Sequence, residues 1–162
     1  GVLLLNIPPD KRGLLTDYDI AALKVWKEKL NSIFEMNLLN DAKGVGAVKK
    51  IKSLLDGNDA THYSFSMKGK DNAIEMNLDG EKTCNVLMLQ ENIRIGQRVE
   101  KFVLEYWTNG EWKKATEGTT IGYKRLLEFP AVTTTKVRLR ILSARLQPAL
   151  AEIGLYFNNN KH

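Results

Sequence analysis

Apolar and polar residues alternate along most of the second half of this chain, and this period of two constrains the fold more than any other feature. The pattern is clearest at residues 74–78 and at 136–141, where basic and apolar residues take turns. Alternation of this kind is typical of strands with one buried face. Turn signals recur every ~8–12 residues from about residue 60 onward, which predicts about seven or eight short strands. We therefore expect a mainly β protein, an antiparallel sandwich or jelly roll.

Three short signals indicate where these strands end. Asp79-Gly80 and Asn109-Gly110 are dipeptides that favour two-residue hairpin turns. Pro130 lacks a backbone N–H, so it should stop the strand that begins near residue 124. The last strand is expected over residues 149–157.

The first third of the chain has a different pattern. Thr16 followed by acidic residues predicts a helix start, and the apolar spacing of three to four predicts a helix over residues 16–39 that docks onto another body. Before it, residues 2–5 are a continuous apolar run, the pattern of a strand buried on both faces. No parallel partner strand follows, which suggests the tail of a longer protein. Residues 40–60 form a joint, in which 47–55 fits either a short helix or a strand.

Composition excludes several classes of protein. With 162 residues, 43% apolar and 27% charged, the chain can form one domain with a real core and is not of disordered composition. No apolar run approaches the ~20 residues of a membrane-spanning helix, and the single cysteine, Cys84, excludes an internal disulfide. The net charge of +5 is spread along the sequence; Lys49-Lys50-x-Lys52 is either a solvated surface or a patch for phosphate or an anionic glycan. We expect no nucleic-acid and no membrane partner.

Residues suited to catalysis are scarce. The histidines are His62 and the terminal His162, and the chain has neither a Gly-x-Ser-x-Gly turn nor a Gly-rich phosphate loop. Asp17 and Asp19 are better explained as helix-start residues than as a glycosidase-type carboxylate pair. We expect no zinc site and no catalysis by this chain alone, and we expect Cys84 to pack as a small hydrophobic residue.

The most informative polar cluster spans residues 54–61, with the sequence LLDGNDAT. Its carboxylates, amide and hydroxyl around a glycine offer the hard oxygen ligands that calcium prefers, but a plain Asx-type turn explains the same residues. A calcium site here would need a further carboxylate from a distant strand. Aromatic residues near the expected loop edges either stack on sugar rings or belong to the core, and the core is the commoner place; they are Tyr106, Trp107, Trp112 and Tyr123.

Two stretches resemble a known family. Residues 3–14, LLLNIPPDKRGL, with the helix expected after them, resemble the end of the catalytic domain of glycoside hydrolase family 29, the alpha-L-fucosidases. There a Leu-Leu-Asn-x-Pro-Pro-x-x-x-Gly segment leaves a late barrel strand and leads into the last helix. Residues 41–158 resemble the discoidin-like (coagulation factor 5/8 C-type) domain that follows in some of these enzymes, which is similar to carbohydrate-binding module family 32. The matching stretches are 55–61, 90–93, 96–99, Trp112, 118–125, 137–139 and 151–156.

This resemblance implies three segments and a role. Residues 1–39 would be a remnant of the catalytic barrel (last strand, loop and helix), 40–158 a galactose-binding-domain-like jelly-roll β-sandwich, and 159–162 a tail. The parent would be a secreted or periplasmic enzyme that hydrolyses terminal alpha-L-fucose from glycans. Its catalytic residues would lie upstream, so this piece would be an inactive accessory domain that braces the barrel of the same polypeptide or binds glycans. A free-standing discoidin-type adhesion module is the alternative.

The resemblance also implies site residues. In such modules a calcium ion often sits under the Asp-Gly-x-x-x-Thr turn, and its distant ligands come from an Ala-Glu pair on the last strand. Carried over residue by residue, the ligands of a structural calcium would be Asp56, Asp59, Thr61, the Ala151 carbonyl and Glu152. In a binding module, some of five other residues should form an exposed cleft at one end of the sandwich; these are His62, Arg98, Trp107, Asn109 and Tyr123. In a brace they should be buried or face the helix.

Overall fold

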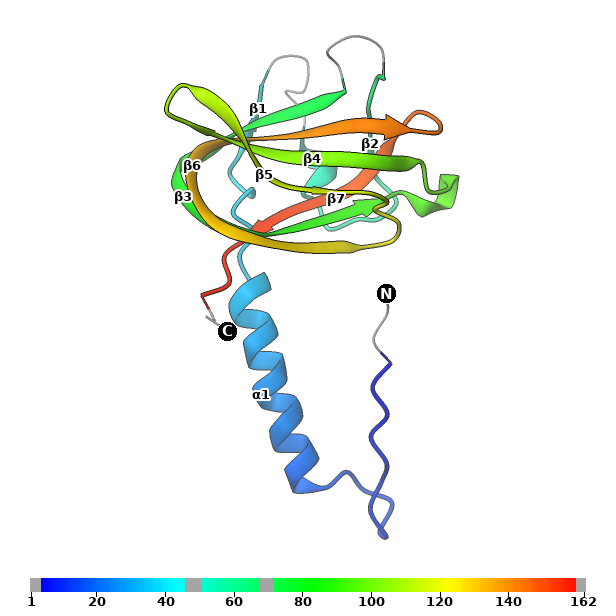
Figure 1. The fold of residues 1–162 in the computed structure, drawn as a ribbon. Coiled ribbons are helices and arrows are strands. Elements are labelled where there is room, and N and C mark those ends of the chain that lie inside the picture. The colour runs from blue at the N-terminus through cyan, green and yellow to red at the C-terminus, as the bar shows by residue number, and fades with distance from the viewer. Residues whose placement is uncertain (1–3, 46–50, 68–71, 160–162) are drawn as a thin grey trace. The chain divides into compact units, whose positions relative to one another are not determined.

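The computed structural model describes residues 4–45, 51–67 and 72–159. The chain divides into two compact units, with the boundary between Met36 and Asn37. The first unit contains one helix, and the second contains all of the strands (Figure 1). Within the described segments, no helix is long and apolar enough to cross a membrane.

Helix α1 (Asp17–Phe34) begins where the sequence predicts. The Thr16 hydroxyl oxygen accepts a hydrogen bond from the Asp19 backbone N–H at 3.1 Å and donates to the Asp19 carboxylate at 2.7 Å, so the first turn is capped. The helix ends at Phe34 and not at residue 39, and none of its 18 residues is buried. The strand expected at residues 2–5 does not form in its described part, because Leu4 and Leu5 are exposed and lie outside any helix or strand; residues 1–3 are outside the described residues.

The second unit is an antiparallel β-sandwich, which confirms the expected fold class. Its strands pair in the order β2-β7-β3-β6-β4-β5, and β1 pairs with β3. The strands are β1 (Lys43–Gly44), β2 (Tyr63–Ser64), β3 (Ala73–Glu91), β4 (Val99–Thr108), β5 (Glu111–Gly118), β6 (Arg125–Ala144) and β7 (Ala149–Tyr156), with the short 3-10 turns η1 (Lys52–Leu54) and η2 (Ile93–Ile95).

The two longest strands, β3 and β6, take part in both layers of the sandwich (Figure 1). Residues 73–77 of β3 pair with 136–140 of β6, which also pairs with β4, whereas 86–91 of β3 pair with β7. The inward side chains of both layers fill one core, because alternate residues of each strand point to the same face. Its fully buried side chains include Phe65, Ile74, Met76, Leu87, Leu89, Phe102, Leu104, Leu139, Ile141 and Leu150.

One of the two expected hairpins forms and the other does not. Asn109 and Gly110 have φ angles of 50° and 80° and join β4 to β5, with Trp107 opposite Trp112, which confirms that prediction. The hairpin expected at Asp79-Gly80 is wrong, because β3 continues through it beside β6. The register moves from Asn77 opposite Lys136 to Lys82 opposite Thr134, so residues 78–81 form a bulge in which Gly80 adopts a φ of 80°.

The strand end expected at Pro130 is also wrong, since β6 runs through it. Val86 lies opposite Glu128 and Cys84 opposite Val132, so the register shifts around Pro130. A proline is tolerated at such an irregularity because its missing N–H interrupts no regular ladder bond. Cys84 itself is fully buried, as expected, and burial raises the pKa of its thiol to about 12.

Residues 37–39 attach the start of the sandwich unit to strand β7. The Asn37 side chain accepts a hydrogen bond from the Leu155 backbone N–H at 3.0 Å and donates to the Ile153 carbonyl at 3.1 Å. The Leu38 backbone N–H donates to the Leu155 carbonyl at 2.9 Å, and Leu39 is buried in the core. These contacts explain why the helix stops before residue 37.

The joint over residues 40–60 is partly described. The segment 47–55, for which the sequence allowed a helix or a strand, contains the 3-10 turn η1, and Leu54 is fully buried there. Lys49 and Lys50 of the basic cluster lie outside the described residues.

Candidate binding groove and cation site

The turn over residues 56–61 is closed by its own polar side chains. The Thr61 hydroxyl lies 3.0 and 2.8 Å from the two Asp56 carboxylate oxygens, and the Asn58 backbone N–H donates to that carboxylate at 2.9 Å. Gly57 has a φ of 69°, a conformation that glycine adopts without strain. The hydrogen bond from Thr61, and then that from the Asn58 backbone, hold the pKa of the Asp56 carboxyl below its ordinary value.

A second carboxylate reaches this turn from the far end of the chain. Glu152 lies on β7, is 7% exposed, and its Oε1 atom is buried without a hydrogen-bond partner in the described residues. Burial, and then the charge of Asp56, raise the pKa of the Glu152 carboxyl. Two neighbouring carboxylates, one of them with an unpaired buried oxygen, form a site that favours a cation.

The five expected calcium ligands are partly brought together. Asp56, Thr61 and Glu152 gather at the turn. Ala151 is fully buried and lies where the register between β3 and β7 shifts, so it has no paired residue on β3. The Asp59 carboxylate instead forms an ion pair with Arg94 at 3.2 Å.

The oxygen donors at this turn fit a hard cation. In the described segments no three His, Cys, Asp or Glu side chains are grouped as metal ligands. Two carboxylates, a hydroxyl and nearby backbone carbonyls are nevertheless the donor types that calcium takes. Asp56, Thr61 and Glu152 are therefore the side chains that would hold the ion.

A polar groove of about 540 Å³ opens beside the cation site. Its lining comes from the outward faces of β3 and β7, from the turn after Asp56, and from the loop before β6. The lining residues are Asn37, Leu55, Gly57, Asn58, Asp59, Met88, Gln90, Tyr123, Lys124, Glu152 and Tyr156. The groove is large enough for a small ligand and much larger than a single ion needs.

The loop that carries Tyr123 is held by Glu91, a residue that the sequence did not single out. Glu91 is 3% exposed. One carboxylate oxygen accepts the backbone N–H groups of Arg98 and Val99 at 2.8 and 2.9 Å, and the other accepts that of Gly122 at 2.9 Å. The Glu91 backbone N–H also donates to the Gly122 carbonyl at 2.9 Å. Glu91 therefore fixes both the start of β4 and the residue before Tyr123.

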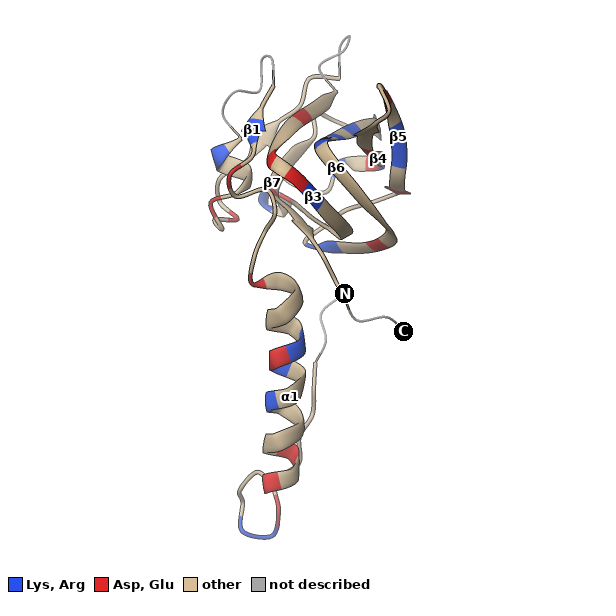
Figure 2. Ribbon diagram, turned by 90° about the vertical axis from the view of Figure 1, so that its left-hand side faces the viewer, with Lys and Arg blue, Asp and Glu red and all other residues tan. Residues whose placement is uncertain are grey.

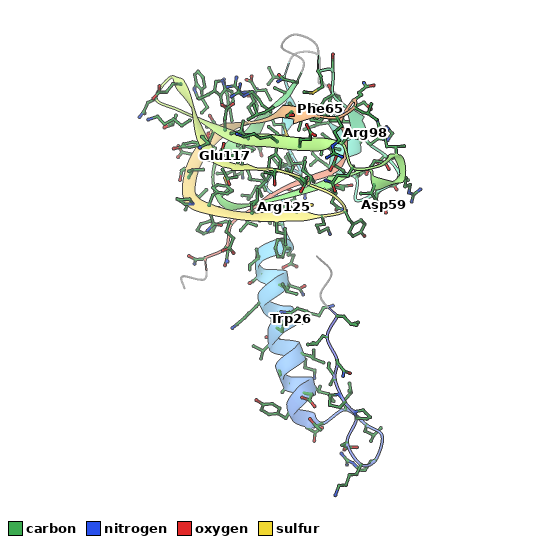
Figure 3. All side chains as sticks on the ribbon, turned by 45° about the vertical axis from the view of Figure 1, so that its right-hand side comes forward. Trp26, Asp59, Phe65, Arg98, Glu117 and Arg125 are labelled. Carbon is green, nitrogen blue, oxygen red and sulfur yellow. The ribbon has the colours of Figure 1, made fainter. Side chains whose placement is uncertain are left out.

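The five residues expected at a sugar cleft do not lie together. Arg98 precedes β4 and Asn109 follows it, so they lie at opposite ends of a ten-residue strand (Figure 1). Arg98 lies toward the same end as Asp59 (Figure 3) and donates to the backbone carbonyls of Ile95 and Gln147. The Arg98 guanidinium is thus already engaged within the protein.

Three of the other expected sugar-binding residues have different surroundings. His62 is exposed, and its Nδ1 atom lies 3.0 Å from the Asn92 side-chain amide. Trp107 packs edge-on against Trp112, with ring centres 5.2 Å apart. Tyr123 is 53% exposed and lines the groove. Tyr123 is therefore the expected sugar-binding residue that the structure places on a hollow surface.

The outer face of β4, β5 and β6 covers its own aromatic rings. Arg138 lies over the Trp112 ring at 4.4 Å from the ring centre. Glu105, which is 8% exposed, pairs with Arg138 at 2.7 Å and with Arg140 at 2.8 Å. Acidic and basic residues are interleaved over the sandwich strands (Figure 2). This face is therefore a closed set of ion pairs and cation–π contacts and offers no bare aromatic platform.

Comparison with known proteins identifies the relatives of this chain. The family model described as F5/8 type C domain matches residues 41–153. A putative alpha-L-fucosidase 1 from Oryza sativa subsp. japonica is 32% identical over 96% of this chain, and alpha-L-fucosidase 1 from Arabidopsis thaliana is 31% identical over 97%. The crystal structure of a putative alpha-L-fucosidase from Bacteroides thetaiotaomicron superposes with a TM-score of 0.80 at 30% identity, over 96% of this chain and 36% of that one.

The matches extend over only part of each relative. The chain spans about a third of the length of the curated relatives, 32% of the rice protein and 33% of the Arabidopsis protein. It corresponds to the C-terminal portion of these family 29 fucosidases. Because the family model covers most of its residues, this chain belongs to the F5/8 type C domain family.

Proposed function

We propose that this chain is the non-catalytic C-terminal accessory domain of an alpha-L-fucosidase, and that it braces the catalytic barrel of the same polypeptide. The parent would hydrolyse terminal alpha-L-fucose from glycans in a secreted or periplasmic setting. Residues 1–39 would be the last part of that barrel. The relatives that carry the fucosidase name are about three times as long as this chain, which leaves room for such a barrel.

The uncovered apolar face of α1 carries this proposal. Leu23, Leu30 and Phe34 follow a helical spacing, and none of the helix's residues is buried within the chain. An isolated helix of this length is marginal in water, because helices in proteins gain most of their stability by packing an apolar face. The rest of the fucosidase polypeptide is the partner that would cover this face.

Charge placed on either side of α1 tests the brace. In an enzyme that carries this chain, Leu30→Asp should lower the melting temperature and shorten the half-life of fucosidase activity, because it puts a carboxylate into the covered face. Val25→Asp is the matched control, since Val25 is an exposed apolar residue on the opposite side of the helix, 52% exposed against 37% for Leu30. Equal stability of both variants and the parent would contradict bracing and favour a free-standing adhesion module. So would finding the domain encoded with no barrel upstream.

We also propose that a structural calcium ion binds at Asp56, Thr61, the Ala151 carbonyl and Glu152. The unpaired buried Oε1 atom of Glu152 beside Asp56 supports this site. The ion would join the 56–61 turn to β7 and offset the repulsion between the two carboxylates.

Thermal melts in calcium and in chelator test the calcium site. At a hundredfold excess over its dissociation constant, a bound ion adds about 2.7 kcal/mol to the free energy of unfolding. Glu152→Ala should lower the melting temperature, and calcium should not restore it. Asp59→Ala, which removes a carboxylate paired with Arg94, should keep the response to calcium. An unchanged melting temperature in excess chelator would remove the calcium proposal.

A further inference from the structure

The groove beside the cation site has the features of a ligand site that sequence comparison did not assign. Its floor is the outward face of β3 and β7, with Met88 and Gln90 from one strand and Glu152 from the other. The turn that contains Asn58 forms one wall, and Tyr123 forms another. A volume of about 540 Å³ lies within the range of small-molecule sites, which are about 300–1,000 Å³.

One polar atom of the groove lacks a partner that a ligand would supply. Glu152 is more than nine-tenths buried, lines the groove, and leaves Oε1 without a hydrogen bond in the described residues. A carboxylate oxygen accepts hydrogen bonds only, so the missing partner is a donor or a cation. The hydroxyl groups of a sugar are donors of this kind.

The groove also has a pre-positioned aromatic wall. Tyr123 and Phe157 are the exposed aromatic side chains among the described residues of the sandwich. Tyr123 lines both the groove and a smaller adjoining hollow of about 120 Å³. The residue before it is fixed by hydrogen bonds to buried Glu91, so the ring can meet a ligand with little loss of loop freedom. An exposed ring of this kind packs against the C–H face of a pyranose.

The remaining polar groups of the lining suit the same kind of ligand. The Lys124 ammonium donates hydrogen bonds, and the amides of Gln90 and Asn58 both donate and accept. A pyranose presents hydroxyl groups around its edge and C–H groups on its faces. The groove therefore offers a complement to both parts of one sugar ring.

We propose that this groove binds a neutral pyranose residue of a glycan, with Tyr123 packed against the ring and the Glu152 carboxylate accepting a hydroxyl hydrogen bond. This site differs from the dispersed residues expected from sequence, of which it contains only Tyr123. It goes beyond the bracing role, because it gives the sandwich a ligand of its own. The proposed calcium uses the same Glu152 carboxylate from the side of Asp56, so sugar binding must be measured with and without the ion.

Chemical-shift titration of the isotope-labelled chain tests the site directly. L-Fucose and D-galactose are added separately, in calcium and in chelator, up to concentrations on the order of 50 mM, since a single sugar ring binds weakly. We expect saturable shifts at the backbone amides of Asn58, Gln90 and Tyr123 with at least one sugar. No saturable shift with either sugar would overturn the proposal, and so would shifts confined to the β4–β5 turn. Shifts at the groove with calcium alone and none with sugar would reduce the groove to a cation site and also overturn it.

Two tyrosine variants give the matched comparison. Tyr123→Ala should weaken sugar binding about tenfold or more, because it removes the packing surface. Tyr18→Ala removes an equally accessible ring, 83% exposed on α1, and should leave binding unchanged. Equal affinity of the Tyr123→Ala variant and the parent chain would overturn the proposal. These measurements do not involve the catalytic barrel, so their failure leaves the bracing proposal to its own test.

Discussion

Replacing Glu91 by glutamine probes how the sandwich holds the loop in front of Tyr123. The Glu91 side chain is 3% exposed and its carboxylate accepts three backbone N–H groups, from Arg98, Val99 and Gly122. Glutamine has nearly the same shape but only one oxygen. Its amide oxygen can keep the two donors of Arg98 and Val99, and its NH₂ group then faces the N–H of Gly122.

The expected cost follows from these three bonds. A hydrogen bond to a charged group contributes about 1.5–3 kcal/mol and a neutral one about 0.5–1.5, so weakening the bonds to Arg98 and Val99 costs about 2 kcal/mol. Leaving the Gly122 N–H without an acceptor costs about 1–3 kcal/mol more. Removing the buried charge recovers part of this, because a glutamine side chain is less costly to desolvate. We expect a net loss of about 2–3 kcal/mol in the free energy of unfolding.

Urea denaturation of the whole chain measures this loss, and hydrogen exchange locates it. For a domain of this size the melting temperature should fall by about 6–15 °C. The Gly122 amide should exchange faster in the variant, since it has lost its acceptor. Glu117→Gln is the control: its carboxylate is half exposed and pairs with Lys114 at 3.3 Å, so its stability should change by less than about 0.5 kcal/mol. A Glu91→Gln variant as stable as this control would refute the role of the carboxylate.

Two further substitutions test packing and electrostatics elsewhere in the sandwich. Gly118→Ala would place a methyl carbon 2.6 Å from the fully buried ring of Phe102, so we expect a loss of about 1–3 kcal/mol in urea denaturation; an unchanged midpoint would mean that the ring has room to move. Hydrogen bonds from Ser143, and then from Arg145, hold the pKa of Glu100 below its ordinary value. A lowered folded-state pKa stabilises the fold above the unfolded-state pKa and is lost as pH falls through the folded one, so Glu100→Gln should flatten the decline in stability between about pH 5 and pH 3, and identical pH profiles would contradict this.

Local turn chemistry predicts a hairpin correctly only where no longer-range pairing opposes it. Asn109-Gly110 and Asp79-Gly80 carry the same signal, yet only the first reverses the chain. After Gly80, residues 82–84 continue to pair with β6, whose 20 residues extend along both halves of β3. The length of that partner strand is not visible in the local sequence around Gly80. The same pairing explains why Pro130 interrupts the register without ending the strand.

The candidate site divides along the same line. The turn at Asp56 is visible locally, because its Asx-type contacts lie within six residues. The approach of Glu152 could be expected only from the resemblance, since periodicity cannot pair residues so distant in sequence. Glu91 gave no signal at all: it stands between Gln90 and Asn92 in a polar run, and its three donors belong to other loops and strands.

The bracing and glycan proposals place different residues under constraint, so they can both hold and can be separated. The brace depends on the apolar face of α1, which includes Leu30, whereas sugar binding depends on Tyr123 and on the floor of the groove. In an intact enzyme, Leu30→Asp should therefore change stability and leave the sugar affinity of the sandwich as it was, and Tyr123→Ala should do the reverse. If Tyr123→Ala destabilised the intact enzyme but not the isolated chain, the groove would be a contact with the catalytic domain, because only the longer polypeptide would supply the missing donor to Glu152.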